Sequence, residues 1–164
     1  DHVADQLSAI LAEMRMSTSK TLSSFCGRPY NNIFMPYPWN PQHAFNSVGE
    51  FLDHYLNIFL EFCGPEHVED LLAPLPWNAP VHLVHGDLFP RNILVDGSRI
   101  TAIIDWETAG FYPDFLEYGR TRCPEWSTPG WDYVLARIFP GPRREPEIGA
   151  ISRIMSMVQY NRLY

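Results

Sequence analysis

Residues 81–107 hold three short runs of β-forming residues, VHLV, NILV and RITAII, with a group of polar side chains among them. An Asp-Gly dipeptide separates the second run from the third, and this dipeptide is a strong signal for a tight hairpin turn. A hairpin brings the outer ends of its two strands together. The sequence therefore predicts that Asn92 and Asp105 lie side by side, with Asp87 a few residues upstream at the same end.

Most of the remaining chain carries helical patterns. Apolar residues recur at spacings of three and four over residues 4–16 and 48–62, and the second run follows the capping-box pattern Ser47-x-x-Glu50. The segment 25–46 is rich in proline, asparagine and aromatic residues, so we expect it to be irregular and to pack over a surface or line a pocket. Further helices are expected near residues 66–72, 114–120, 131–138 and 147–161. Together these patterns predict one α+β domain over residues 1–164, mainly α with a small β-hairpin.

Composition excludes several classes of protein. The 164 residues are 46% apolar, which suits a packed domain, and the net charge of -7 argues against a general binder of nucleic acid or anionic membranes. No apolar run approaches the ~20 residues of a membrane span, and the N-terminus lacks the pattern of a signal peptide. Three scattered cysteines with no metal-ligand spacing are typical of thiols in a reducing compartment, so a cytoplasmic location is expected.

The polar cluster suggests a specific chemistry. An amide oxygen and a carboxylate that converge suit a hard cation such as Mg²⁺, and a second carboxylate nearby can position or deprotonate a hydroxyl. Residues 85–92, HGDLFPRN, fit the protein-kinase catalytic loop H-R-D-L-x-x-x-N at every fixed position except Gly86. Asp105 stands where kinases have the metal-binding Asp of D-F-G, although Trp106 and Glu107 follow it here. The alternative is that these acids merely cap turns.

Two segments resemble a known family. HGDLFPRNILV and IIDWE closely resemble the aminoglycoside phosphotransferase and choline-kinase-like superfamily of protein-kinase-like enzymes, and AGFYPDFLEY resembles its fungal branch. That family has HGD where protein kinases have HRD, so Gly86 supports the resemblance. The likeness is sharp from Leu83 to Tyr118 and looser elsewhere, where the chain resembles the family's C-terminal lobe. It implies a kinase-like C-terminal lobe without the N-terminal β lobe.

The resemblance also implies an activity, namely ATP- and Mg²⁺-dependent transfer of a phosphoryl group to the hydroxyl of a small molecule. Asp87 would be the catalytic base, and His85 would brace the catalytic loop. Asn92 and Asp105 would hold Mg²⁺ on the phosphates of ATP. A buried structural role is the alternative for His85.

Other residues are open to two interpretations. Leu94 and Ile104 would form the apolar floor under the adenine, or else they are plain core. Glu107 is an outer ligand of the metal or a salt-bridge partner. Arg91 contacts phosphate or is a surface charge, while the acids of the helix near 114–120 cap and decorate it. Three aromatic residues form an acceptor pocket or simply pack, namely Phe34, Tyr37 and Trp39.

Two parts of the kinase machinery are absent from the sequence. The ten glycines include no G-x-G, and the single lysine, Lys20, follows a helix rather than lying on a strand. With no initiator methionine either, we expect a truncated C-terminal lobe whose uncovered apolar face is buried by a second copy or a partner chain. The alternatives are a pseudokinase-like interaction module and a repurposed cleft that catalyses ATP-independent cyclisation or isomerisation. The acceptor is not readable from the sequence, although the negative net charge favours a cation.

Overall fold

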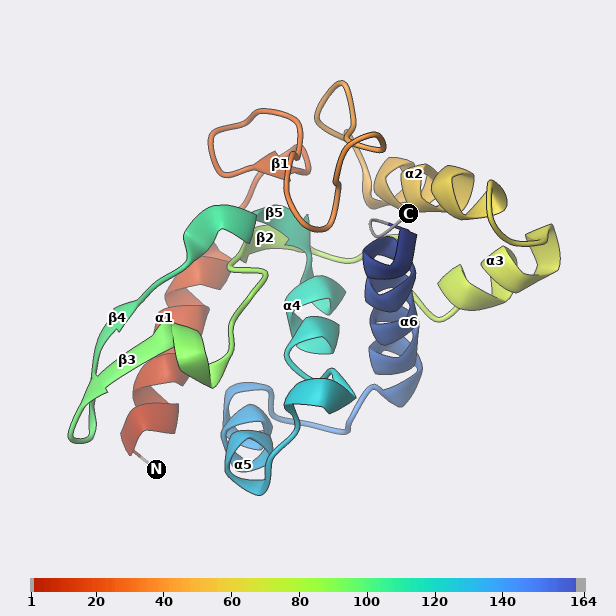
Figure 1. Ribbon diagram of the computed structural model, residues 1–164. Coiled ribbons are helices and arrows are strands. Elements are labelled where there is room, and N and C mark those ends of the chain that lie inside the picture. Colours follow the sequence, from red (N-terminus) through yellow and green to blue (C-terminus); the bar gives the residue numbers. More distant parts are fainter. Residues whose placement is uncertain (1, 162–164) are drawn as a thin grey trace.

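The computed structural model describes residues 2–161 (Figure 1). Its helices and strands, in chain order, are α1 (His2–Met16), β1 (Ser23–Ser24), α2 (Val48–Leu60), α3 (Pro65–Leu72), β2 (Val81–Val84), β3 (Ile93–Asp96), β4 (Arg99–Ile103), β5 (Gly110–Pro113), α4 (Asp114–Arg120), α5 (Pro129–Ile138) and α6 (Glu145–Asn161). Each helix that the periodicity predicted is present, with ends within about two residues of those expected. The hairpin β3–β4 is confirmed as well.

Two strands were not predicted, the two-residue β1 and the longer β5. β5 pairs antiparallel with both β2 and β1, which gives a three-stranded sheet in the order β1-β5-β2 beside the separate hairpin. The sequence of β5 is GFYP, and glycine and proline at its two ends are more typical of a turn than of a strand. It is extended because β2 supplies a hydrogen-bonding edge from a distant part of the chain. This sheet fixes the position of the chain that enters and leaves the hairpin.

Local signals explain where α2 starts. The Ser47 hydroxyl accepts a hydrogen bond from the Glu50 backbone N–H at 3.0 Å, and the Glu50 carboxylate accepts one from the Asn46 backbone N–H at 2.6 Å. The first of these bonds satisfies a backbone donor that the first helical turn leaves unpaired, and the second ties Glu50 to the residue before the N-cap. The next helix, α3, begins at Pro65, whose missing N–H costs nothing at that position.

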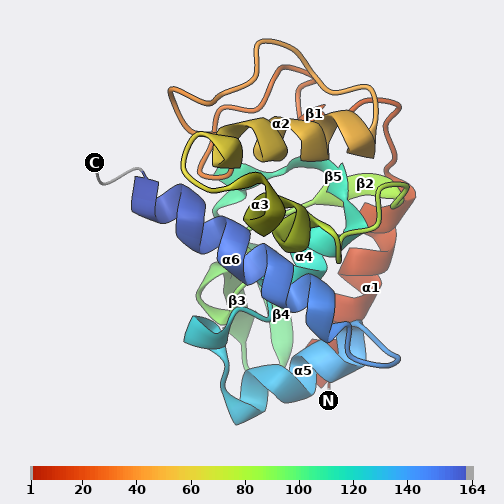
Figure 2. The ribbon, with the colours of Figure 1, turned by 90° about the vertical axis from the view of Figure 1, so that its right-hand side faces the viewer.

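The core has two parts, and Figure 2 shows the helices that enclose them. The larger lies among α2, α3, α4 and α6, and the smaller lies between α1, α5 and the inner side of the hairpin. The helices α4 and α6 run beside each other in both views. The region that the kinase-like motif predicted as catalytic therefore rests on helices on one side and is open on the other. No helix within residues 2–161 is long and apolar enough to cross a membrane.

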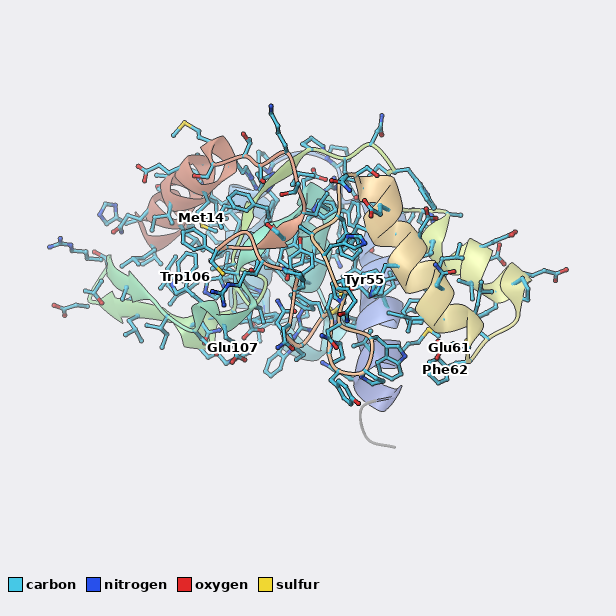
Figure 3. All side chains as sticks on the ribbon, turned by 90° about the horizontal axis from the view of Figure 1, so that it is seen from above. Met14, Tyr55, Glu61, Phe62, Trp106 and Glu107 are labelled. Carbon is cyan, nitrogen blue, oxygen red and sulfur yellow. The ribbon has the colours of Figure 1, made fainter. Side chains whose placement is uncertain are left out.

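The irregular segment 25–46 packs over the larger core. Phe34 is buried, and its carbonyl accepts a hydrogen bond from the Tyr55 hydroxyl at 3.1 Å. Trp39 lies edge-on to Phe62, with ring centroids 5.7 Å apart, whereas Tyr37 is 84% exposed. Figure 3 shows Tyr55 and Phe62 on this side of the molecule, far from Trp106 and Glu107. Phe34 and Trp39 thus pack, and these three aromatic residues do not form one acceptor pocket.

Candidate active site

The hairpin places Asn92 opposite Ile104, the residue that precedes Asp105. Ile93 pairs with Ile103, and one step further out the Ile104 backbone N–H donates to the Asn92 carbonyl at 2.9 Å. Asp105 follows directly, in the left-handed conformation with φ 67° and ψ 58°. Few residues other than glycine adopt this region, and aspartate is among those that do. The chain turns sharply there, at an exposed position.

The Asp87 carboxylate is the most heavily bonded group of the site. One of its oxygens, Oδ2, accepts hydrogen bonds from Arg91 Nη2 at 2.6 Å and from Asn92 Nδ2 at 2.9 Å. The other, Oδ1, lies 3.5 Å from Arg120 Nη2. Asn92 Nδ2 also donates to the Asp87 carbonyl at 2.8 Å. Three side chains from two parts of the chain, the adjacent Arg91 and Asn92 and the more distant Arg120 of α4, therefore fix the orientation of this carboxylate.

Arg91 was expected either to contact phosphate or to be a surface charge, but the structure places it against two aromatic rings and the Asp87 carboxylate. Its guanidinium lies 4.7 Å from the ring centroid of Phe89 and 4.6 Å from that of Trp126. Contact with two aromatic rings restricts a side chain that is otherwise flexible and adds cation–π attraction. Arg91 is thus held against Asp87 rather than extending freely into water. The i to i+4 spacing from Asp87 was a signal in the sequence that could have suggested this ion pair.

His85 is buried and supports the loop from within. Its Nδ1 accepts a hydrogen bond from the Asp87 backbone N–H at 3.2 Å, so Nε2 carries the proton and donates to the Ile104 carbonyl at 3.0 Å. Burial lowers the pKa of this imidazole. A neutral ring thereby links the catalytic loop to the end of the hairpin. Its contacts match the bracing role that the resemblance implied.

Glu117 was assigned to the surface of a helix, and that interpretation is wrong. The structure buries it, and its Oε2 and Oε1 accept hydrogen bonds from the backbone N–H groups of His85 at 2.8 Å and Gly86 at 3.1 Å. Burial raises the pKa of Glu117 to about 7, although the two N–H donors oppose the shift. The signal that was missed is a short helix, FLEYGR, that is buried on every side and leaves no exposed face for an acid.

Gly86 is required by its surroundings as well as by the motif. Its φ is +84°, and a Cβ atom at this position would lie 2.8 Å from the Thr108 hydroxyl oxygen and 2.9 Å from a ring carbon of Phe34. The Thr108 hydroxyl meanwhile donates to the His85 carbonyl at 2.8 Å. An arginine, as in the protein-kinase motif, does not fit here without moving this packing.

Leu94 and Ile104 are not core residues. They are 45% and 41% exposed on the hairpin, and Val95 and Trp106 are exposed beside them. Figure 3 places Trp106 at the base of the hairpin. The Trp106 indole N–H donates to the Ile103 carbonyl at 2.7 Å, which holds the ring against the hairpin end. This surface is apolar and open, as we expected for the face of the lobe that lies next to the hairpin.

The oxygen ligands predicted for Mg²⁺ fit such an ion chemically. Because both described bonds of the Asn92 amide use Nδ2, its Oδ1 remains available as a ligand, and the Asp105 carboxylate is exposed and forms no ion pair with any described residue. Nowhere in residues 2–161 do three His, Cys, Asp or Glu side chains gather as a metal cluster. A cation held by two side chains would need phosphate oxygens and water to complete its shell, which is how Mg²⁺ binds with nucleotides. Glu107 is exposed and joins no described ion pair.

These features define the class of the fold. Helices carry a hairpin whose two ends bear the kinase-like acid and amide residues, which is the arrangement of a protein-kinase-like C-terminal lobe in an α+β fold. Residues 2–148 match the model of the phosphotransferase enzyme family, APH, and the chain belongs to that family. A search of curated proteins found no match to the chain.

Solved structures of one enzyme share the fold. A thermostable mutant of the aminoglycoside phosphotransferase APH(4)-Ia in its apo form superposes with a TM-score of 0.62 at 17% identity and covers 99% of this chain. A ternary complex of such a mutant with ADP and hygromycin B gives a TM-score of 0.60 at 19% identity over 98% of the chain. In both, this chain spans 59% of the length of the other protein.

Proposed function

We propose that this chain is the catalytic half of an ATP- and Mg²⁺-dependent phosphotransferase that acts on the hydroxyl of a small molecule. The observation that carries the proposal is the convergence of Asp87, Asn92 and Asp105 at one end of the hairpin, because neither turn capping nor packing calls for all three. The family membership supports phosphoryl transfer, and the related structures, with ADP or AMP-PNP and hygromycin B bound, support a nucleotide and a small-molecule acceptor.

In this mechanism Asp87 orients the acceptor hydroxyl and takes its proton as the bond from the hydroxyl oxygen to the γ-phosphorus of ATP forms and the bond from that phosphorus to ADP breaks. Asp87 can do this because Arg91 and Asn92 fix its carboxylate before the acceptor arrives, and positioning contributes much of the catalysis of phosphoryl transfer. Asn92 and Asp105 would hold Mg²⁺, which neutralises charge on the phosphates when bound. His85 keeps the loop in place through its two ring hydrogen bonds and does not exchange a proton.

The adenine would lie against Leu94 and Ile104. Their exposure leaves an apolar surface, beside Trp106, on which a flat base can be partly removed from water. That a second copy or a partner chain covers this face stays a prediction. Sedimentation of the purified chain at several concentrations tests whether it self-associates.

Calorimetric titration with ATP, with and without Mg²⁺, tests the nucleotide half of the proposal. We expect binding that requires Mg²⁺ and that Asp105→Ala abolishes. Asp53→Ala, which removes an exposed acid on α2, is the matched control and should bind as the parent does. If Asp105→Ala binds Mg²⁺ and ATP as tightly as the parent chain, the assignment of this acid is wrong.

Turnover tests the catalytic half. Asp87→Asn should lower the rate of phosphoryl transfer by about a hundredfold or more, the range for loss of a general base, while nucleotide affinity stays nearly constant. Consumption of a metabolite in the absence of ATP would instead support a repurposed cleft with acid/base chemistry. An unchanged rate in Asp87→Asn would mean that Asp87 is not catalytic and would favour the alternative of a pseudokinase-like interaction module.

A further inference from the structure

The two oxygens of the Asp87 carboxylate are bonded differently. Oδ2 accepts hydrogen bonds from Arg91 Nη2 at 2.6 Å and from Asn92 Nδ2 at 2.9 Å. A carboxylate oxygen offers about two lone pairs, so these two donors occupy Oδ2. Oδ1 accepts no hydrogen bond from any residue that the structure describes, and its ion-pair partner, Arg120 Nη2, is 3.5 Å away. The lone pairs of Oδ1 are therefore the ones left for a substrate.

Oδ1 is also open to a molecule from outside. Within residues 2–161, the buried polar side-chain atoms that lack a hydrogen-bond partner are Arg120 Nε, Arg122 Nη1 and Glu147 Oε2. Asp87 Oδ1 lacks such a partner too, yet it is not one of these closed-off atoms, and the Asp87 side chain as a whole is 15% exposed. The hydroxyl of an acceptor can therefore come within hydrogen-bonding distance of Oδ1.

Arg120 is a buried cation beside Asp87. It is the last residue of α4 and is 7% exposed, whereas the side chain of Arg91 is 43% exposed. The Arg120 guanidinium lies 5.2 Å from the ring centroid of Phe89, and the same ring lies 4.7 Å from the guanidinium of Arg91. Burial and this aromatic contact restrict Arg120, so the fold sets the position of its charge.

Stability does not account for a buried arginine here. Arg120 Nε is closed off from water without an acceptor, and a buried unpaired donor lowers the stability of the folded state. A buried ion pair is often no more stabilising than apolar side chains of the same volume. Holding the reacting carboxylate does account for it, because the described ion pair of Arg120 is with Asp87.

The distance between the two groups suits such a role. A strong charge-assisted hydrogen bond from nitrogen to a carboxylate oxygen is about 2.7–2.9 Å long. At 3.5 Å, the Arg120 guanidinium attracts Oδ1 without occupying its lone pairs. Because Arg91 and Asn92 hold only Oδ2, this attraction fixes the second end of the carboxylate.

From this geometry we infer that Oδ1 is the atom of Asp87 that takes the acceptor proton, and that Arg120 is a positioning residue whose charge holds the carboxylate with Oδ1 available. The hydroxyl proton passes to Oδ1 as the hydroxyl oxygen bonds to the γ-phosphorus of ATP and the bond from that phosphorus to the ADP oxygen breaks. Oδ1 later releases the proton to water. Arg120 itself touches neither substrate. This inference rests on the proposed phosphotransferase function.

The release of phosphate from ATP in the presence of Mg²⁺, with water in place of the acceptor, tests the role of Arg120. Arg120→Met removes the charge but keeps a long apolar side chain, and Arg120→Lys keeps the charge. We expect Arg120→Met to lower kcat by about tenfold to a hundredfold, as misplacement of a reacting group does, with the KM for ATP nearly unchanged. Arg120→Lys should retain a higher kcat than Arg120→Met. If Arg120 only filled space, methionine would serve at least as well as lysine.

The matched controls are Arg122→Met and Arg122→Lys. Arg122 is 8% exposed and has a closed-off N–H of its own, but its described contacts are with Leu135, Tyr118 and Phe139. Both variants should keep the kcat of the parent. Urea unfolding gives the folded fraction of every variant, by which its kcat is corrected.

A double variant tests whether Arg120 acts through Asp87. In an Asp87→Asn background, Arg120→Met should change kcat by less than about twofold, because residues that act as a unit are not additive. Three results would each overturn the inference and leave the proposed function standing: an unchanged kcat in Arg120→Met, methionine as active as lysine, or an equal loss in the Asp87→Asn background. A parent chain that releases no phosphate would also reject the inference, and titration with Mg²⁺ and ATP would then show whether nucleotide binding survives.

Discussion

Glu117→Gln tests whether a buried acid holds the catalytic loop. In the structure, Glu117 accepts hydrogen bonds from the backbone N–H groups of His85 and Gly86, and burial raises its pKa from an ordinary 4.5 to about 7. A group whose pKa is raised on folding favours the folded state most at low pH. Its contribution is present below pH 4.5 and is lost as the pH rises through about 7.

The size of the effect follows from that shift. At roughly 1.4 kcal/mol per pKa unit, ionisation of Glu117 should lower the free energy of unfolding by about 2–3 kcal/mol between pH 5 and pH 8. Glutamine does not ionise, so the variant lacks this loss. The NH₂ group of the glutamine amide, however, would point at a backbone N–H, and two donors cannot bond to each other. One unpaired donor costs about 1–3 kcal/mol at every pH. We therefore expect Glu117→Gln to be the less stable protein at pH 5 and to approach the parent chain at pH 8.

Urea unfolding followed by tryptophan fluorescence at pH 5 and pH 8 measures both proteins. At each pH, the free energy of unfolding of the parent is subtracted from that of the variant. The decisive quantity is how much this difference changes between pH 5 and pH 8, because the contributions of other titrating groups cancel. Glu69→Gln, which alters an exposed acid on α3, is the matched control and should give a change near zero. If the change for Glu117→Gln is also below about 0.5 kcal/mol, Glu117 does not titrate as its burial implies, and the reasoning fails.

Three further substitutions test the packing that supports the site. Gly119→Ala should lower the free energy of unfolding by about 1–3 kcal/mol, because the new Cβ would lie 2.7 Å from Ile151 Cβ where α4 meets α6. Gly149→Ala, in α6 with no atom within 4 Å of the new Cβ, should instead raise it by about 0.5–1 kcal/mol, and equal effects of the two alanines would contradict this contact. Ser47→Ala should lower the free energy of unfolding by about 0.5–2 kcal/mol, because the hydrogen bond from the Glu50 backbone N–H is lost. Chemical denaturation measures all three variants. An unchanged midpoint for Ser47→Ala would show that this cap contributes nothing to stability.

Predictions that depended on local signals were confirmed. The Asp-Gly turn fixed the hairpin, and the hairpin register placed Asn92 beside the residues that precede Asp105. Helical spacing located each helix, and the capping-box pattern placed the start of α2. In all these cases the responsible residues lie within a few positions of one another, so the physical cause is contained in the sequence window itself.

The supports of the site come from distant parts of the chain. Glu117 binds the backbone of His85 across 32 positions, although its own neighbours in sequence gave it the appearance of a surface acid. Arg120 shares that short helix and lies beside Asp87 for the same reason. Neither contact has a local pattern, since each depends on how closely α4 packs against β2 and the loop that follows it.

The sequence alone thus indicated which residues could perform the chemistry and predicted the hairpin whose ends carry Asn92 and Asp105. Tertiary structure decided which charges surround them. The chain is acidic on average, yet packing of α4, α5 and α6 gathers four arginines around two cavities beside α6 and buries two of them, Arg120 and Arg122. Net charge is a sum over residues, whereas the field that a ligand meets depends on their distances, and only the folded chain fixes those distances.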